Sequence, residues 1–182
     1  NVVGLSVRLN VTHTWAGDLV AVLKAPNGQI INLVALLDGT GGAGPTTGFT
    51  NTVISSTGVT ALDDAATQPF TGTYAANLYL NPIIGLGAGY YDPMPVGPTG
   101  FLPTTANWNN LYSRANGDWT LAIYDGYDDS GAPGQPVNTL NNWAINITYG
   151  TPATGVFSPA LGLSTDAAGT VPYTGTAVNT VY

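Results

Sequence analysis

The sequence predicts an all-β protein built as an antiparallel β-sandwich, and three observations carry this prediction. Short apolar runs that alternate with polar residues recur along the chain, and turn-forming residues separate them. Glycine and proline are frequent, with 24 and 13 copies in 182 residues. Residues that favour helices are scarce, since the chain has three Lys and Arg together and no Glu, and no apolar run follows a helical period.

The clearest local prediction is a β-hairpin close to the N-terminus. Residues 3–11 alternate apolar with small or polar residues, as a half-buried strand does. Residues 19–23 are more continuously apolar and predict a central strand, and residues 29–37 predict its partner. Residues 25–28, Ala-Pro-Asn-Gly, predict the turn between them, because proline presets φ and Asn-Gly accepts positive φ.

The middle of the chain carries weaker signals. The Gly-rich residues 38–51 predict a long loop, and residues 52–62 predict one strand. Residues 70–80 predict an extended segment. Residues 82–105 are rich in Gly and Pro and predict an insertion in a surface loop.

Two tryptophan-containing strands are predicted in the second half. In residues 117–125, Trp119 shares one parity with Leu121 and Ile123, and in residues 140–150 Trp143 shares one parity with two isoleucines. Each set therefore faces the core. We expect the two strands to be antiparallel neighbours.

The composition also limits the domain organisation and the classes of binding partner that we expect. We expect one domain over residues 1–150, and over residues 151–182 a linker with the start of a further module. The formal net charge of −7 argues against nucleic acid and against an anionic membrane surface. The absence of cysteine excludes disulfides and thiolate chemistry. No apolar run approaches the roughly 20 residues of a spanning helix, so we expect no membrane insertion. We expect a secreted or cell-surface bacterial protein, cut from a longer precursor.

Three stretches resemble the P domain, or Homo B domain, of the furin- and kexin-type proprotein convertases. They are "THTWAGDLVAVLKAPNG" from Thr12, "PFTGTY" from Pro69, and "GDWTLAIYDGYDDSGAPGQPVNTLNNWAINI" from Gly117, in the family's order. The resemblance implies a jelly-roll β-sandwich, of the galactose-binding-domain-like kind, that follows a subtilisin-like serine protease domain in the same polypeptide. It implies a non-catalytic accessory domain that packs on the catalytic domain and stabilises it. It also implies bacterial relatives in secreted proteases and Ca²⁺ binding by some of these jelly rolls. The start of the tail, "FSPALGLSTDAAG", resembles the beginning of Ig-like modules in large secreted bacterial proteins.

The only histidine, His13, has two interpretations. It is a general base with Asp18 and a serine, or it is a strand-end residue whose ring nitrogens bond nearby backbone. The chain has no G-x-S-x-G or S-x-x-K motif, so we favour the structural role and expect no enzyme activity of the chain itself. Asp18 in turn either fixes the start of the hairpin or joins an ion site with Asp38.

The acidic turn after residue 124 is the best candidate for Ca²⁺, which prefers six to eight oxygen ligands. Asp125, Asp128 and Asp129 lie within five positions, with glycines that allow a sharp bend. The alternative is a solvated acidic turn. The adjacent Asp63 and Asp64 are a weaker candidate.

Aromatic residues in or near loops suggest the alternative function of a carbohydrate- or surface-binding module, in which rings stack on sugars. The alternative for these rings is packing at the rim of the domain or against a neighbouring domain. The residues concerned are Trp15, Trp108, Tyr90, Tyr91, Tyr112 and Tyr127.

Overall fold

The computed structural model describes the chain with seven gaps and a masked C-terminal end. The described residues are 1–13, 15–35, 48–62, 69–84, 95–126, 138–151, 156–157 and 161–179. The chain divides into two compact units, Val2–Thr148 and a second one of Tyr149–Tyr182 with Asn1.

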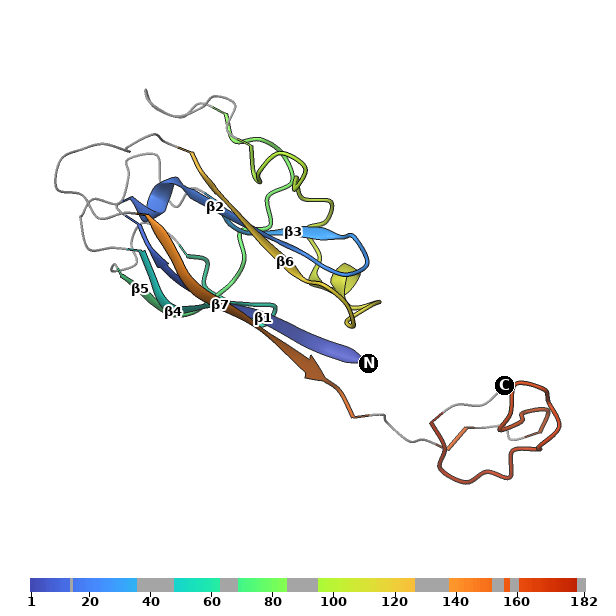
Figure 1. Cartoon of the computed structure of the whole chain (residues 1–182). Coiled ribbons are helices and arrows are strands. Elements are labelled where there is room, and N and C mark those ends of the chain that lie inside the picture. Colours follow the sequence, from blue (N-terminus) through green and yellow to red (C-terminus); the bar gives the residue numbers. More distant parts are fainter. Residues whose placement is uncertain are drawn as a thin grey trace, which may run out of the picture. The chain divides into compact units, whose positions relative to one another are not determined.

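The first unit is nearly all β, as the sequence predicts. Its strands form two sheets, one with the order β5-β4-β1-β7 and one with the order β3-β2-β6 (Figure 1). Two 3₁₀ turns, η1 and η2, are the helical elements of the described residues. The elements are β1 (Val2–Thr12), η1 (Ala16–Asp18), β2 (Leu19–Lys24), β3 (Ile30–Ala35), β4 (Gly48–Ser55), β5 (Phe70–Tyr74), η2 (Trp108–Leu111), β6 (Thr120–Asp125) and β7 (Thr139–Tyr149).

The predicted hairpin is present. β2 pairs with β3 antiparallel, and β2 is the central strand of its sheet. The Gly28 N–H donates to the Ala25 carbonyl at 2.9 Å across the turn, and Gly28 has a φ of +86°. The turn chemistry of Pro-Asn-Gly was therefore sufficient to place this hairpin.

The sheets are not purely antiparallel, which corrects one prediction. β1 pairs with β4, and β2 with β3 and β6, in antiparallel fashion, but β4 and β5 run parallel. Alternation along a strand reports which face is buried, and it carries no information on the direction of the partner strand.

The two tryptophan strands are not neighbours, which corrects a second prediction. β6 lies at the edge of one sheet, beside β2, and β7 lies at the edge of the other sheet, beside β1. The parity of the side chains was nevertheless right. Trp119, Leu121 and Ile123 from β6 and its approach, and Trp143 and Ile145 from β7, are partly buried and pack against the same core.

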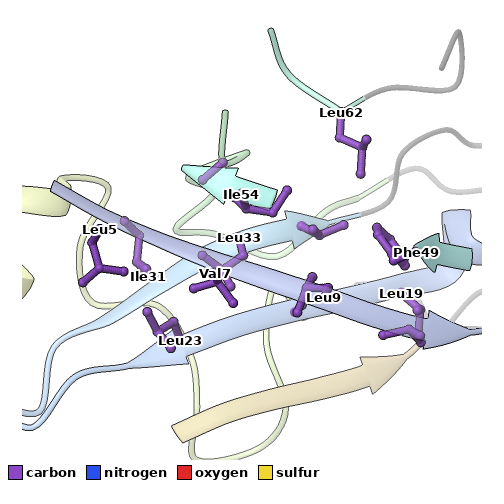
Figure 2. Close-up of a cluster of buried hydrophobic side chains, with 14 of the residues drawn as sticks. Leu5, Val7, Leu9, Leu19, Leu23, Ile31, Leu33, Phe49, Ile54 and Leu62 are labelled. Atoms are coloured by element: carbon purple, nitrogen blue, oxygen red, sulfur yellow. The ribbon is translucent and has the colours of Figure 1, made fainter. Parts of the chain in front are cut away.

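The core lies between the sheets and draws on both (Figure 2). The close-up shows apolar side chains from β1 and β4 of one sheet and from β2 and β3 of the other. Labelled residues include Leu5, Val7, Leu9, Leu19, Leu23, Ile31, Leu33, Phe49 and Ile54. This cluster joins the sheets in a sandwich-like arrangement.

β4 begins at Gly48, inside residues 38–51 that the sequence predicts as a loop. Gly48 has a φ of +125°, and a Cβ there would overlap the carbonyl oxygen of Val11. The glycine thus permits a close approach of β4 to β1, so a residue that suggested a loop belongs to the sheet.

The outer face of β2 and β3 is covered, although residues 82–105 are predicted as a surface insertion. Val96 of this segment is fully buried, and its carbonyl accepts a hydrogen bond from Asn32 Nδ2 at 3.1 Å. The backbone N–H groups of Thr104 and Thr105 donate to the Ile30 carbonyl. The described part of the segment is therefore a layer over the sheet rather than a free loop.

The second unit contains a small loop around Asp166. Its carboxylate accepts hydrogen bonds from the Thr170 hydroxyl and from the backbone N–H groups of Thr170 and Val171. Ser164 and Pro172 form an antiparallel bridge beside this loop. Tyr173 is buried, and its hydroxyl accepts from the Phe157 N–H at 2.9 Å.

Candidate functional site

His13 lies directly after β1 and is only 2% exposed. Its Nε2 is 3.0 Å from Oδ2 of Asp125, the last residue of β6. Its Nδ1 accepts a hydrogen bond from the backbone N–H of Trp15 at 3.1 Å. Because β1 and β6 belong to different sheets, this histidine connects the two sheets at one end.

The contacts fix the role of each ring nitrogen. A backbone N–H can only donate, so Nδ1 carries no hydrogen and Nε2–H donates to the Asp125 carboxylate. A general base needs a ring nitrogen that can take a proton from substrate, and in a Ser-His-Asp triad the carboxylate holds Nδ1 while Nε2 faces the nucleophile. In this chain both nitrogens already have partners within the fold. The geometry favours the structural interpretation of His13.

The structure also shows which carboxylate bonds the ring. The sequence suggested Asp18, and the hydrogen bond at Nε2 is made by Asp125, far away in the chain. A residue separation of 112 leaves no local pattern from which this pair could be read. The expectation that ring nitrogens bond nearby backbone is confirmed for Nδ1 and wrong for Nε2.

Asp18 lies at the same end of the sheets. It is buried in the 3₁₀ turn η1, immediately before β2, and its backbone carbonyl accepts from the Gly126 N–H at 2.9 Å. The neighbouring Leu19 pairs with Asp125 across β2 and β6. The G-D-L sequence thus fixes where β2 starts relative to the end of β6.

Asp125 combines a structural bond with exposure to solvent. Its side chain is 37% exposed, and Asn138 Nδ2 donates to the same oxygen, Oδ2, at 3.4 Å. Within the ranges that the structure describes, no three His or Asp side chains gather as a metal site. The other candidate ligands, Asp38, Asp63, Asp64, Asp128 and Asp129, lie outside the described residues.

The aromatic candidates divide into three groups. Trp108, at the start of η2, is 8% exposed and packs in the core, so it presents no ring to a sugar. Trp15 and Tyr112 are partly exposed. Tyr90, Tyr91 and Tyr127 lie outside the described residues. The sequence could not distinguish Trp108 from a surface ring, because tertiary packing decides its exposure.

A cavity of about 250 Å³ lies between the edge strands β6 and β7, beside the His13–Asp125 pair. Leu121 and Ile123 of β6 and Leu140 of β7 form apolar parts of its wall, and Asn138 and Asp125 supply polar groups. We call this region the β6/β7 seam, defined by the five residues just named. The sequence missed it, because the prediction placed β6 and β7 side by side in one sheet.

Comparisons with family models, with curated proteins and with solved structures found no match to this chain. Among the described residues, no helix has the length and apolar character needed to cross a bilayer.

Proposed function

We propose that this chain contains a non-catalytic accessory domain of the P-domain type, with jelly-roll topology, in a secreted subtilisin-like serine protease. The observation that carries the proposal is the bonding of His13. Both ring nitrogens hold parts of the fold together, which supports a role of the one histidine as a connection between the sheets over a role as a base.

The positions of the quoted motifs support the same interpretation. In the first motif, His13 and Asp18 define the end of β1 and the start of β2, and Gly28 completes the hairpin turn. In the last motif, Asp125 ends β6 and bonds His13. Residues that recur in the P-domain signature are framework residues in this chain, as an accessory domain requires.

Docking on a neighbouring domain fits the β6/β7 seam. Leu121 and Ile123 pack against the core but remain partly exposed, and Leu140 is 44% exposed. Apolar surface that remains partly in contact with water gains free energy when a partner covers it. We propose that the subtilisin-like domain of the same polypeptide covers this seam.

Ca²⁺ is part of the proposal. Asp125 ends β6 and is followed within four positions by Asp128 and Asp129, and Asp18 lies at the same end of the sheets. Carboxylates this close together in the sequence of a chain of net charge −7 repel one another, and a divalent cation would remove that repulsion.

The test uses the longer polypeptide with the proposed protease domain. Leu140→Lys is expected to lower the yield and melting temperature of the catalytic domain, because it places a charge in the covered seam. Val59→Lys is the matched control, since Val59 is 95% exposed and lies outside the seam. Unchanged folding and casein cleavage after removal of residues 1–150 would contradict the proposal.

A second arm tests the absence of catalysis. The 182-residue chain and its His13→Ala variant are expected to cleave casein and ester substrates no faster than buffer. Hydrolysis by the unaltered chain that disappears in the variant would identify His13 as a catalytic base and overturn the proposal.

A further inference from the structure

The few positive charges of this chain are unevenly placed. It has three Lys and Arg residues, and two of them, Lys24 and Arg114, line one open cleft of about 610 Å³. The cleft lies beside the β2–β3 turn, at the end of β2 opposite to Asp18 and His13. The third cation, Arg8 of β1, lies outside the cleft and donates to the amide oxygen of Asn51.

Neither cation of the cleft is neutralised by a carboxylate of the described residues. Within the described ranges, the one contact between a carboxylate and a basic side chain at ion-pair distance is His13–Asp125, at the opposite end of the sheets. Asp118 also lines the cleft but forms no ion pair with Lys24 or Arg114. A local excess of positive charge therefore exists on a protein whose net charge is −7.

The cleft walls are held in place. Asn27 Nδ2 donates to the Asn110 carbonyl and to the Ser113 hydroxyl, both at 2.8 Å, which ties the turn to η2 and to the segment after it. The Lys24 ammonium lies 5.7 Å from the centre of the Phe101 ring. Binding at a preformed site loses less conformational entropy than binding at a mobile one.

The cleft reaches the first residue of an edge strand. Thr120, the first residue of β6, lines it, and β6 is the edge strand of its sheet. The backbone groups of an edge strand can pair with an extended polypeptide, while pockets beside the edge select side chains. A saccharide would not use the strand edge in this way.

From these observations we propose that the cleft binds an extended acidic polypeptide segment, whose Asp or Glu carboxylates contact Lys24 and Arg114 while its backbone lies beside Thr120 at the start of β6. This site lies at the other end of β6 from Asp125 and the His13 connection. It needs neither a protease neighbour nor Ca²⁺, so it stands independently of the function proposed above.

The test measures binding of a fluorescein-labelled peptide of alternating Asp and Thr to the whole chain by fluorescence anisotropy. A peptide with Asn in place of Asp is the ligand control. Lys24→Met and Arg114→Met are each expected to weaken binding about fivefold, and together more than tenfold, in line with partly exposed charge pairs. Binding is expected to weaken as salt is raised. Circular dichroism melts verify that both variants fold, and Arg114 is exposed, so its replacement leaves the core untouched.

Two further variants make the outcome specific. Arg8→Met removes the one cation outside the cleft and is expected to leave the affinity unchanged, whereas Asp118→Asn removes a repulsive charge and is expected to tighten binding. No measurable binding of the Asp peptide, or equal losses for Arg8→Met and Arg114→Met, would overturn the proposal. Binding of oligogalacturonate in place of the Asp peptide would also overturn it, because the cleft would then select carboxylates on sugars.

Discussion

The outer faces of the two sheets in the first unit differ in their exposure to solvent. The outer face of β4, β1 and β7 is polar and open, with Asn10 bonded to Asn51 on one side and to Asn142 on the other. The outer face of β2 and β3 is buried, and Val20 and Val22 are completely inaccessible to solvent. One sheet is therefore an outer layer of the fold, and the other is its middle layer.

This difference explains the two kinds of apolar pattern in the sequence. β1 alternates between buried and exposed residues, as expected for a strand with one wet face. β2 and β3 are buried at almost every position, as expected for strands covered on both sides. The cover comes from segments without regular strands, including Val96 and the residues that bond β3, such as Asn77.

The largest expected effect comes from a charge placed on the covered face. Val22→Asp should destabilise the fold by about 4 kcal/mol or more, because the carboxylate would be buried without a partner. Val53→Asp, on the open face of β4 beside Arg8, should cost less than about 1 kcal/mol. Urea denaturation of both variants measures the difference, and equal losses would show that the two faces are not distinct.

A smaller loss is expected when the cover itself is displaced. A Cβ at Gly97 would lie 2.4 Å from the Phe101 carbonyl oxygen and 3.1 Å from Val22 Cγ1. Gly97→Ala should therefore cost about 3 kcal/mol, near the upper end for overpacking, because backbone cannot give way easily.

Gly100→Ala is the matched control in the same segment. A Cβ there meets nothing within 4 Å, and only its φ of +82° opposes the substitution, so about 1 kcal/mol is expected. If thermal melts give the same loss for both variants, close packing of residues 95–105 on β2 is not what stabilises the cover.

Local chemistry explains which parts of the fold could be predicted. The Pro26-Asn27-Gly28 turn and the parity of Trp119 and Trp143 are local properties, and each was predicted correctly. Pairing of β6 with β2, and the parallel pairing of β5, depend on contacts distant in the chain. The Gly- and Pro-rich composition of residues 82–105 suggested a surface loop. Composition does not show whether the backbone of such a segment is buried and hydrogen-bonded to a neighbouring strand.

The connection between the sheets provides the next prediction. His13→Ala should lower the free energy of unfolding by about 2 kcal/mol, since it leaves the Asp125 carboxylate and the Trp15 N–H without their bonds to the ring. A double-mutant cycle with Asp125→Ala measures the pair directly. A loss in the double variant that equals the sum of the single losses would show that the two side chains are not coupled.

For the candidate site, the sequence identified the residues but not which of them bond to each other. His13, Asp18 and Asp125 were all singled out, and all three lie at one end of the sheets. The bond between His13 and Asp125 joins strands of different sheets, so no spacing in the chain encodes it. The sequence did not indicate the cleft of Lys24 and Arg114, because the three cations are widely separated along the chain. Only the fold brings two of them to one cleft.

Calcium should stabilise the end of the sheets that holds His13 and Asp125, and not the opposite end. At millimolar Ca²⁺ we expect about 1–2 kcal/mol of added stability relative to EDTA, as for weak extracellular sites. Asp128→Asn and Asp129→Asn should abolish this gain, and Asp118→Asn, in the cleft at the other end, should not. Superimposable melts with and without Ca²⁺ would remove calcium from the proposed function.

The smallest expected effect lies outside both sheets, at Asp166 of the second unit. The hydrogen bond from the Thr170 hydroxyl, followed by that from the Val171 N–H, lowers the pKa of Asp166 below its ordinary value of 3.8. A carboxyl with a depressed pKa stabilises the folded loop fully above the ordinary value, and this contribution is lost as pH falls through the lowered pKa. The titration of the Val171 amide signal should therefore have its midpoint below pH 3.8, while signals from β2 do not follow the same titration. Asp166→Asn should remove this titration, and a Val171 titration whose midpoint lies at or above pH 3.8 would show that another group controls the loop.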